Sequence, residues 1–132
     1  MQMKRTRRMF LILTLLLIGA IGHATTRGAD ADALDAVQDY LGALVAGDVE
    51  RVRSNLGAAL SQQRSALLAN PDYPESLRRA YADARFRVTH SEQIAPDRAR
   101  VDAQLFLGGN QILNVQFVLE AQGFGYKIVY EN

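Results

Sequence analysis

One histidine and a nearby carboxylate are the first groups in this sequence that could do chemistry together. His90 is followed two residues later by Glu92, so in a strand both side chains would lie on one side, about 7 Å apart. A histidine can act as a general base near neutral pH when a partner orients it. The competing interpretation is a solvated histidine at the sheet margin. The sequence favours that interpretation, since no second catalytic group accompanies the pair.

The residue inventory argues against thiol and metal chemistry. The chain of 132 residues contains no cysteine and two histidines, which excludes disulfides, thiol catalysis and thiolate metal sites. One of the two, His23, belongs to an N-terminal targeting segment, and a single remaining histidine without a spaced second ligand is not a metal site. We therefore expect no metal and no cofactor.

Four arginines form the second candidate group. Arg85 and Arg87 alternate with an apolar residue, as do Arg98 and Arg100 in the next segment. They could form a small cationic patch for a ligand carboxylate or an acidic partner. Acidic residues nearby could instead neutralise them as a solvated, salt-bridged sheet face. The sequence favours this second interpretation, because exposed ion pairs contribute little.

The elements that would position these residues are four short strands. Apolar residues recur at every second position in segments 85–94, 98–107, 111–120 and 124–130, which is the period of a strand with one buried face. Turn-like residues at 95–97, 108–110 and 122–123 separate the segments. Short connections favour antiparallel neighbours, so the pattern predicts a four-stranded meander.

The preceding segment, residues 30–83, has helical periodicity and should cover the sheet. Its first helix should begin at Asp30 or Asp32 and end near Ala46, before a Gly47 stop and an Asp48 cap. The apolar stripe of this helix consists of Leu34, Val37, Leu41, Leu44 and Val45. A second helix that Gly57 can interrupt should carry its apolar residues on roughly one side, namely Val49, Val52, Leu56, Leu60 and Leu67, and a short third helix has Pro74 near its start. Helices followed by an antiparallel sheet predict an α+β domain, with N-terminal helices packed on a curved sheet.

The N-terminus has the layout of a secretory signal peptide. A basic head precedes an apolar run over residues 9–21, and small residues precede a cut before Thr25. The alternative is an uncleaved anchor, for which the run is short. Either way the sequence predicts a single folded domain, residues 25–132, in the periplasm or secreted, and at the inner membrane only if residues 9–21 stay attached.

Nucleic acid is an unfavourable partner for that domain. Residues 1–24 contain Lys4, Arg5, Arg7 and Arg8, so 11 of the 15 basic residues remain against 14 acidic ones, a net charge of −3. The domain has no basic run.

The stretch of residues 36–49, Ala-Val-Gln-Asp-Tyr-Leu-Gly-Ala-Leu-Val-Ala-Gly-Asp-Val, resembles the first helix of the nuclear transport factor two-like (NTF2-like) superfamily. This superfamily includes ketosteroid isomerase, scytalone dehydratase and small secreted proteins. The resemblance covers the element order over residues 30–132. It implies a cystatin-like cone, in which a bent antiparallel sheet wraps the first helix and leaves a pocket at the wide end.

The resemblance carries over only one of three catalytic groups of the isomerases. Tyr40 falls at the position that resembles their oxyanion-donating tyrosine. Segment 58–68, where their general-base aspartate would lie, contains no acid, and the later strand offers Asn114 and Gln116 in place of a protonated aspartic acid. Tyr40 is then favoured as a core aromatic with its hydroxyl bonded locally.

The sequence predicts a binding domain of the cell envelope and no complete catalytic set. The partner would be a small apolar ligand, an envelope protein or a second copy that forms a homodimer. The alternatives are an isomerase- or dehydratase-type enzyme that uses Tyr40 and His90 in the cone pocket, and a membrane-anchored accessory domain. Five residues are candidates for lining the pocket: Tyr40, Phe86, His90, Phe117 and Tyr126.

Overall fold

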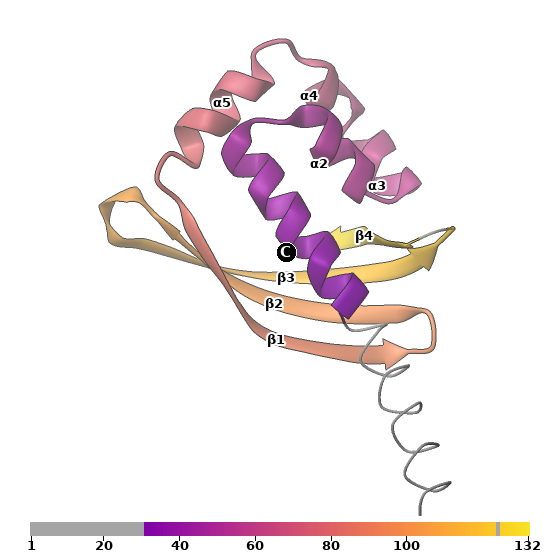
Figure 1. Ribbon diagram of the computed structural model, residues 1–132. Coiled ribbons are helices and arrows are strands. Elements are labelled where there is room, and N and C mark those ends of the chain that lie inside the picture. The colour runs from indigo at the N-terminus through magenta and orange to yellow at the C-terminus, as the bar shows by residue number, and fades with distance from the viewer. Residues whose placement is uncertain (1–30, 124) are drawn as a thin grey trace, which may run out of the picture.

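The computed structural model describes residues 31–123 and 125–132 (Figure 1). The predicted signal peptide or anchor, residues 1–24, lies outside these ranges, as does Phe124. Within them, no helix has both the length and the apolar character needed to cross a membrane.

The C-terminal half forms one four-stranded antiparallel sheet in the order β1-β2-β3-β4. The strands are β1 (Arg85–Ala95), β2 (Arg98–Leu107), β3 (Gln111–Gln122) and β4 (Gly125–Glu131). The predicted meander is confirmed. The turn between β2 and β3 is a short 3-10 segment, Gly108–Asn110, in which Gly109 and Asn110 adopt positive φ angles of 73° and 62°.

The helical segments of the described residues cover one face of this sheet (Figure 1). The first helix is helical from residue 31 to residue 46 and is the unlabelled indigo helix that crosses the sheet. It is followed by α2 (Val49–Asn55), α3 (Ala58–Gln63), α4 (Ser65–Ala69) and α5 (Tyr73–Ala80). The predicted α+β architecture is confirmed.

The core lies between the first helix and the sheet. Val37, Leu41 and Leu44 of the predicted stripe are at most 4 % exposed. They belong to the same buried cluster as Val101 and Leu119 of the sheet. Apolar burial of this kind is the main favourable term in folding.

The prediction for Leu67 is wrong. Leu67 is 46 % exposed and Leu68 is buried in its place. The reason is the interruption at Arg64, which separates α3 from α4 and resets the helical phase.

Two glycines mark close approaches between elements. Gly47 has φ +68°, and a Cβ atom there would lie 2.6 Å from the Pro74 carbonyl oxygen. Gly57 separates α2 from α3, and its N–H donates to the Ile128 carbonyl at 2.8 Å. A Cβ atom at Gly57 would lie 3.1 Å from Val129 Cγ1. The predicted break at Gly57 therefore joins the helical layer to β4.

The two faces of the sheet differ in chemistry. The inner face, toward the helices, carries buried apolar residues such as Val101, Ala103 and Phe117. The outer face carries the alternate residues of β2, including Arg100 and Asp102. Side chains alternate strictly along a regular strand, so a register shift places the residues beyond it on the face opposite to the one that the alternation predicts.

Candidate functional site

A register shift in β4 turns a carboxylate toward the helices. Leu119 pairs with Ile128, whereas the preceding β3 residue, Val118, pairs with Tyr130. Val129 is therefore an extra residue on β4, a β-bulge. Beyond it, Glu131 pairs with the buried Phe117 and shares its inner face.

Glu131 meets Tyr40 and Arg64 on the inner side of the sheet. The Tyr40 hydroxyl donates to Glu131 Oε2 at 2.8 Å, and Arg64 Nη1 donates to the same oxygen at 3.0 Å. Arg64 Nη1 also donates to the Tyr40 hydroxyl oxygen at 3.3 Å. The side chains of Arg64 and Glu131 are 29 % and 22 % exposed. We call these three residues the interior triad.

Electrostatics keep the phenol of Tyr40 protonated. Burial is the largest cause that raises the pKa of Tyr40, and the Glu131 carboxylate raises it further. The ring is 2 % exposed and packs edge-on against Phe117, with centroids 5.8 Å apart. Two other partly buried tyrosines, Tyr73 and Tyr81, also have their pKa raised by burial. Tyr40 is therefore a core aromatic, and its hydroxyl bonds a residue 91 positions away.

Three hydrogen bonds link the members of the interior triad to one another. The single proton of the Tyr40 hydroxyl points to Glu131, so it is not free to donate to a substrate oxyanion. Glu131 Oε2 already accepts from two donors. This arrangement stabilises the contact between the first helix, the α3–α4 junction and β4.

His90 does not lie on the face expected from its spacing to Phe86 and Val88. Val88 pairs with Ala103 on the inner face, but His90 pairs with Asp102 on the outer face, because Thr89 is an extra residue in β1. The expected proximity to Glu92 is confirmed, with 3.3 Å between His90 Nε2 and Glu92 Oε2.

Tyr40 and His90 therefore lie on opposite faces of the sheet and do not form one site. Tyr40 is buried on the inner face, whereas the His90 side chain is 49 % exposed on the outer face.

The other pocket candidates remain on the inner side but differ in exposure. Phe117 is fully buried in the core. Tyr126 is partly buried and packs against the core cluster. Phe86 is 37 % exposed and pairs with Leu105 near the end of the sheet where β2 and β3 join.

The candidate arginine patch is largely paired. Arg98 lies 3.4 Å from Glu120, and Arg100 lies 3.1 Å from Asp102 and 3.7 Å from Glu92. Arg87 donates to the side chain of Gln104 at 3.0 Å. The outer face is thus a salt-bridged surface around these residues, as the second interpretation of the sequence expected.

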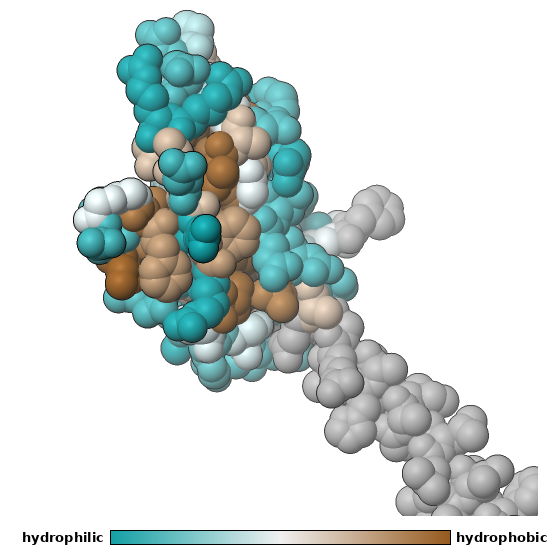
Figure 2. Space-filling model, turned by 60° about the vertical axis from the view of Figure 1, so that its left-hand side comes forward, coloured by the Kyte–Doolittle hydropathy of each residue, from teal (hydrophilic) through white to brown (hydrophobic). Residues whose placement is uncertain are grey.

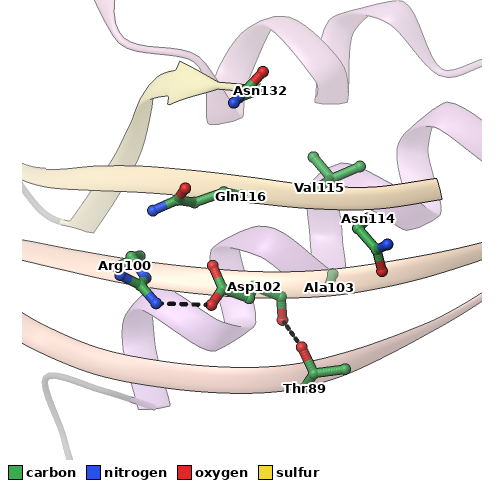
Figure 3. Close-up of a pocket in the computed structure, with 8 residues that line it drawn as sticks. All are labelled: Thr89, Arg100, Asp102, Ala103, Asn114, Val115, Gln116 and Asn132. Carbon is green, nitrogen blue, oxygen red and sulfur yellow. Dashed lines mark hydrogen bonds and ion pairs between the residues drawn. The ribbon is translucent and has the colours of Figure 1, made fainter.

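A polar groove of about 400 Å³ lies on the sheet beside this network (Figure 3). Its polar lining comes from β1, β2, β3 and the residue after β4, and Ala103 and Val115 complete it. The polar residues are Thr89, Arg100, Asp102, Asn114, Gln116 and Asn132. The Thr89 hydroxyl donates to the Asp102 carbonyl at 3.2 Å. Among the residues that the structure describes, no group of three or more histidines and carboxylates could hold a metal ion.

Sequence reasoning missed Arg64 and Glu131. They are 67 residues apart, and neither belongs to a spaced motif. One local signal was present: Ile128, Val129 and Tyr130 form a run without the alternation of the rest of β4, which is where a bulge can reverse the faces.

Two solved structures superimpose on most of this chain. A protein from Campylobacter jejuni, named as a candidate NTF2-like transpeptidase, matches with a TM-score of 0.56 and 9 % identity, over 75 % of this chain and 98 % of its own. An NTF2-like protein of unknown function from Shewanella oneidensis MR-1 matches with a TM-score of 0.56 and 13 % identity, over 76 % and 94 %.

The chain has the NTF2-like fold. A ketosteroid isomerase-like protein from Erwinia carotovora atroseptica gives a TM-score of 0.49 at 14 % identity, over 77 % of this chain and 92 % of its own. No protein-family model and no curated protein matches the sequence. At these identities the NTF2-like likeness defines the fold and leaves the activity to be argued from the site.

Proposed function

We propose that this NTF2-like chain is a binding domain without catalytic activity, that it acts outside the cytoplasm, and that its groove holds an uncharged, hydroxyl-rich ligand such as a short glycan. The observation that carries the proposal is the chemistry of the groove lining. Amide and hydroxyl groups of Thr89, Asn114, Gln116 and Asn132 stand beside an arginine that is already paired with an acid.

The charge balance of the groove favours a neutral ligand. Arg100 lies within 4 Å of both Asp102 and Glu92, so no uncompensated cation is offered to an anion. Each amide both donates and accepts hydrogen bonds, which matches the paired donors and acceptors of sugar hydroxyl groups. A volume of about 400 Å³ is within the common range for small-molecule sites.

The interior of the cone is a poorer candidate for the binding site. Tyr40 and Phe117 are at most 2 % exposed and fill the region behind the first helix. The hydroxyl of Tyr40 is committed to Glu131. A ligand there would have to displace packed aromatic rings and an ion pair, at a cost of several kcal/mol, on the order of a large core substitution.

Oligomers of N-acetylglucosamine are a suitable probe, because they are neutral and rich in hydroxyl and amide groups. Titrated into the purified protein and followed by NMR, they should shift the amide signals of Gln116 and Asn132. The Gln116→Ala variant should weaken binding about 5- to 10-fold, the value of one or two hydrogen bonds. The matched control is Gln93→Ala, an exposed amide that bonds only the Pro96 carbonyl, which should leave the affinity unchanged.

Two results would count against this function. Shifts confined to Tyr40 and Phe117 would move the site into the cone. No shift with charged or neutral oligosaccharides would remove the glycan-binding proposal.

The location of the domain is tested separately. A signal peptide that is removed would leave a mature chain that begins at Thr25, as the small residues before that position indicate. N-terminal sequencing of the protein from its cells decides between release and a retained anchor.

A further inference from the structure

β3 extends beyond the end of its neighbour β4. The ladder between them covers Phe117 to Gln122 of β3, and Asn132 adds a last pair of hydrogen bonds with Gln116 at 3.0 and 3.2 Å. Within residues 31–123 and 125–132, no strand pairs with residues 111–115 of β3 on this side. We call residues 111–115 the open edge.

Every second residue of the open edge directs its backbone N–H and carbonyl groups away from β2. Gln116 directs both its N–H and its carbonyl toward Asn132, and strand residues direct these groups to alternate sides. Ile112 and Asn114, at even spacing from Gln116, therefore present two donors and two acceptors to the open side. Leu113 between them bonds β2, with which it pairs at Leu105.

The opposite edge of the sheet is protected, and the open edge is not. β1 has two register shifts and carries Arg85, Arg87 and His90, which are common devices against strand pairing. The open edge reads Gln-Ile-Leu-Asn-Val, without a charge, a proline or a shift against β2. Ile112 and Leu113 are 54 % and 38 % exposed, and Figure 2 shows apolar residues gathered on this side of the molecule.

We propose that a second copy of this chain pairs with the open edge, antiparallel and symmetric about Leu113. Leu113 of one copy then lies opposite Leu113 of the other, and Ile112 of each copy exchanges both backbone hydrogen bonds with Asn114 of the other. The two free edges are of equal length and satisfy each other's four hydrogen-bonding groups. The second copy would border the groove proposed for the ligand, because Asn114 and Val115 belong to both surfaces.

Charge and shape favour a second copy over a charged partner strand. Neither residues 111–115 nor their β2 partners, residues 103–107, include a charged side chain, so self-pairing brings no like charges together. On the inner face, the apolar row Phe86, Leu105 and Leu113 continues into the same row of the other copy. Pairing along five residues buries less surface than the 1,200–2,000 Å² that is usual for a stable interface. The dimer should therefore be weak and concentration-dependent, with a dissociation constant on the order of micromolar or weaker.

A single-cysteine variant tests the register, because the chain contains no cysteine. In the symmetric dimer, Leu113 forms a non-hydrogen-bonded pair whose Cβ atoms approach closely enough for a disulfide. Leu113→Cys should therefore cross-link to a covalent dimer under mild oxidation. Ile94→Cys is the matched control: its parent residue is 49 % exposed on the opposite edge and should cross-link only at the rate of random collision.

Sedimentation velocity tests the association itself. The wild-type protein should show a dimer that grows with concentration, and Leu113→Lys should abolish it by placing two ammonium groups opposite each other. Ile94→Lys should keep the wild-type profile, and circular dichroism should show both variants folded. A wild-type protein that stays monomeric at all concentrations, or equal cross-linking of Leu113→Cys and Ile94→Cys, would overturn the proposal.

Discussion

The register shifts in β1 and β4 move polar side chains in opposite directions. In β4, the extra residue Val129 turns Glu131 to the inner face. In β1, the extra residue Thr89 turns His90 to the outer face. In each strand the bulge therefore places the residues beyond it on the face opposite to the one that strict alternation of the sequence would give.

Glu131 and His90 differ in their exposure and in their bonding partners. Glu131 is 22 % exposed and bonds Tyr40 and Arg64 at 2.8 and 3.0 Å. His90 is 49 % exposed, and its partner Glu92 is 44 % exposed. Because screening by water weakens exposed pairs, the inner group should contribute to stability and the outer group should contribute little.

Changes at the two bulges should show the largest effect. Insertion of one alanine between Tyr130 and Glu131 moves Glu131 to the outer face and leaves Arg64 unpaired, so we expect a loss of about 3 kcal/mol or more in the free energy of unfolding. Deletion of Thr89 removes the bulge of β1 but leaves His90 opposite Asp102, so it should cost less, about 1–2 kcal/mol. Urea unfolding followed by circular dichroism measures both; equal costs would contradict the comparison.

Two arginines provide the next contrast. Arg64→Met removes the cation that neutralises the partly buried Glu131 and should cost about 2–3 kcal/mol. Arg100→Met on the outer face should cost at most about 1 kcal/mol, since the side chain is 37 % exposed. The same urea experiment compares them, and a larger loss for Arg100→Met would reverse the assignment of the two faces.

Tyr40→Phe should give a smaller effect with a pH signature. It removes the hydrogen bond that the Tyr40 hydroxyl donates to Glu131 and the one that it accepts from Arg64, together worth about 1–2 kcal/mol. Burial raises the pKa of Tyr40 in the folded protein, so its contribution is fully present below the pKa of an unfolded tyrosine, about 10, and is lost as the pH rises above that value. Above about pH 10, the free energy of unfolding of the variant should fall less steeply with pH than that of the wild type. Parallel curves of the free energy of unfolding against pH would show that Tyr40 is not buried in its protonated form.

His90→Gln should give the smallest effect. The His90 side chain contacts Glu92 at an exposed position, so the free energy of unfolding should change by no more than about 0.5 kcal/mol. A change above 1 kcal/mol would indicate a structural role for the outer network.

The sequence was sufficient for the fold because its dominant signal is periodic. Val101, Ala103 and Leu105 recur at every second position and are buried on one face. Val37, Leu41 and Leu44 recur at helical spacing and cover that face. Such patterns depend only on the local geometry of strands and helices, so they can be recognised in a single sequence.

The candidate sites could not be predicted in the same way. A bulge changes the face of every residue beyond it, and Thr89 and Val129 are ordinary strand residues with no distinguishing type. Arg64 and Glu131 meet only because the helical layer folds over the end of β4, a contact across 67 residues. The groove likewise combines residues of β1, β2 and β3 with the residue after β4, from Thr89 to Asn132.

A double-mutant cycle between Arg64 and Glu131 tests the central claim, that the carboxylate beyond the bulge in β4 meets Tyr40 and Arg64 on the inner face. The variants are Arg64→Met, Glu131→Gln and the double variant, each unfolded in urea. We predict a coupling energy of about 1–3 kcal/mol, as for residues in one ion-pair network. Additive single losses, within about 0.5 kcal/mol, would show that Glu131 does not meet Arg64 inside the cone.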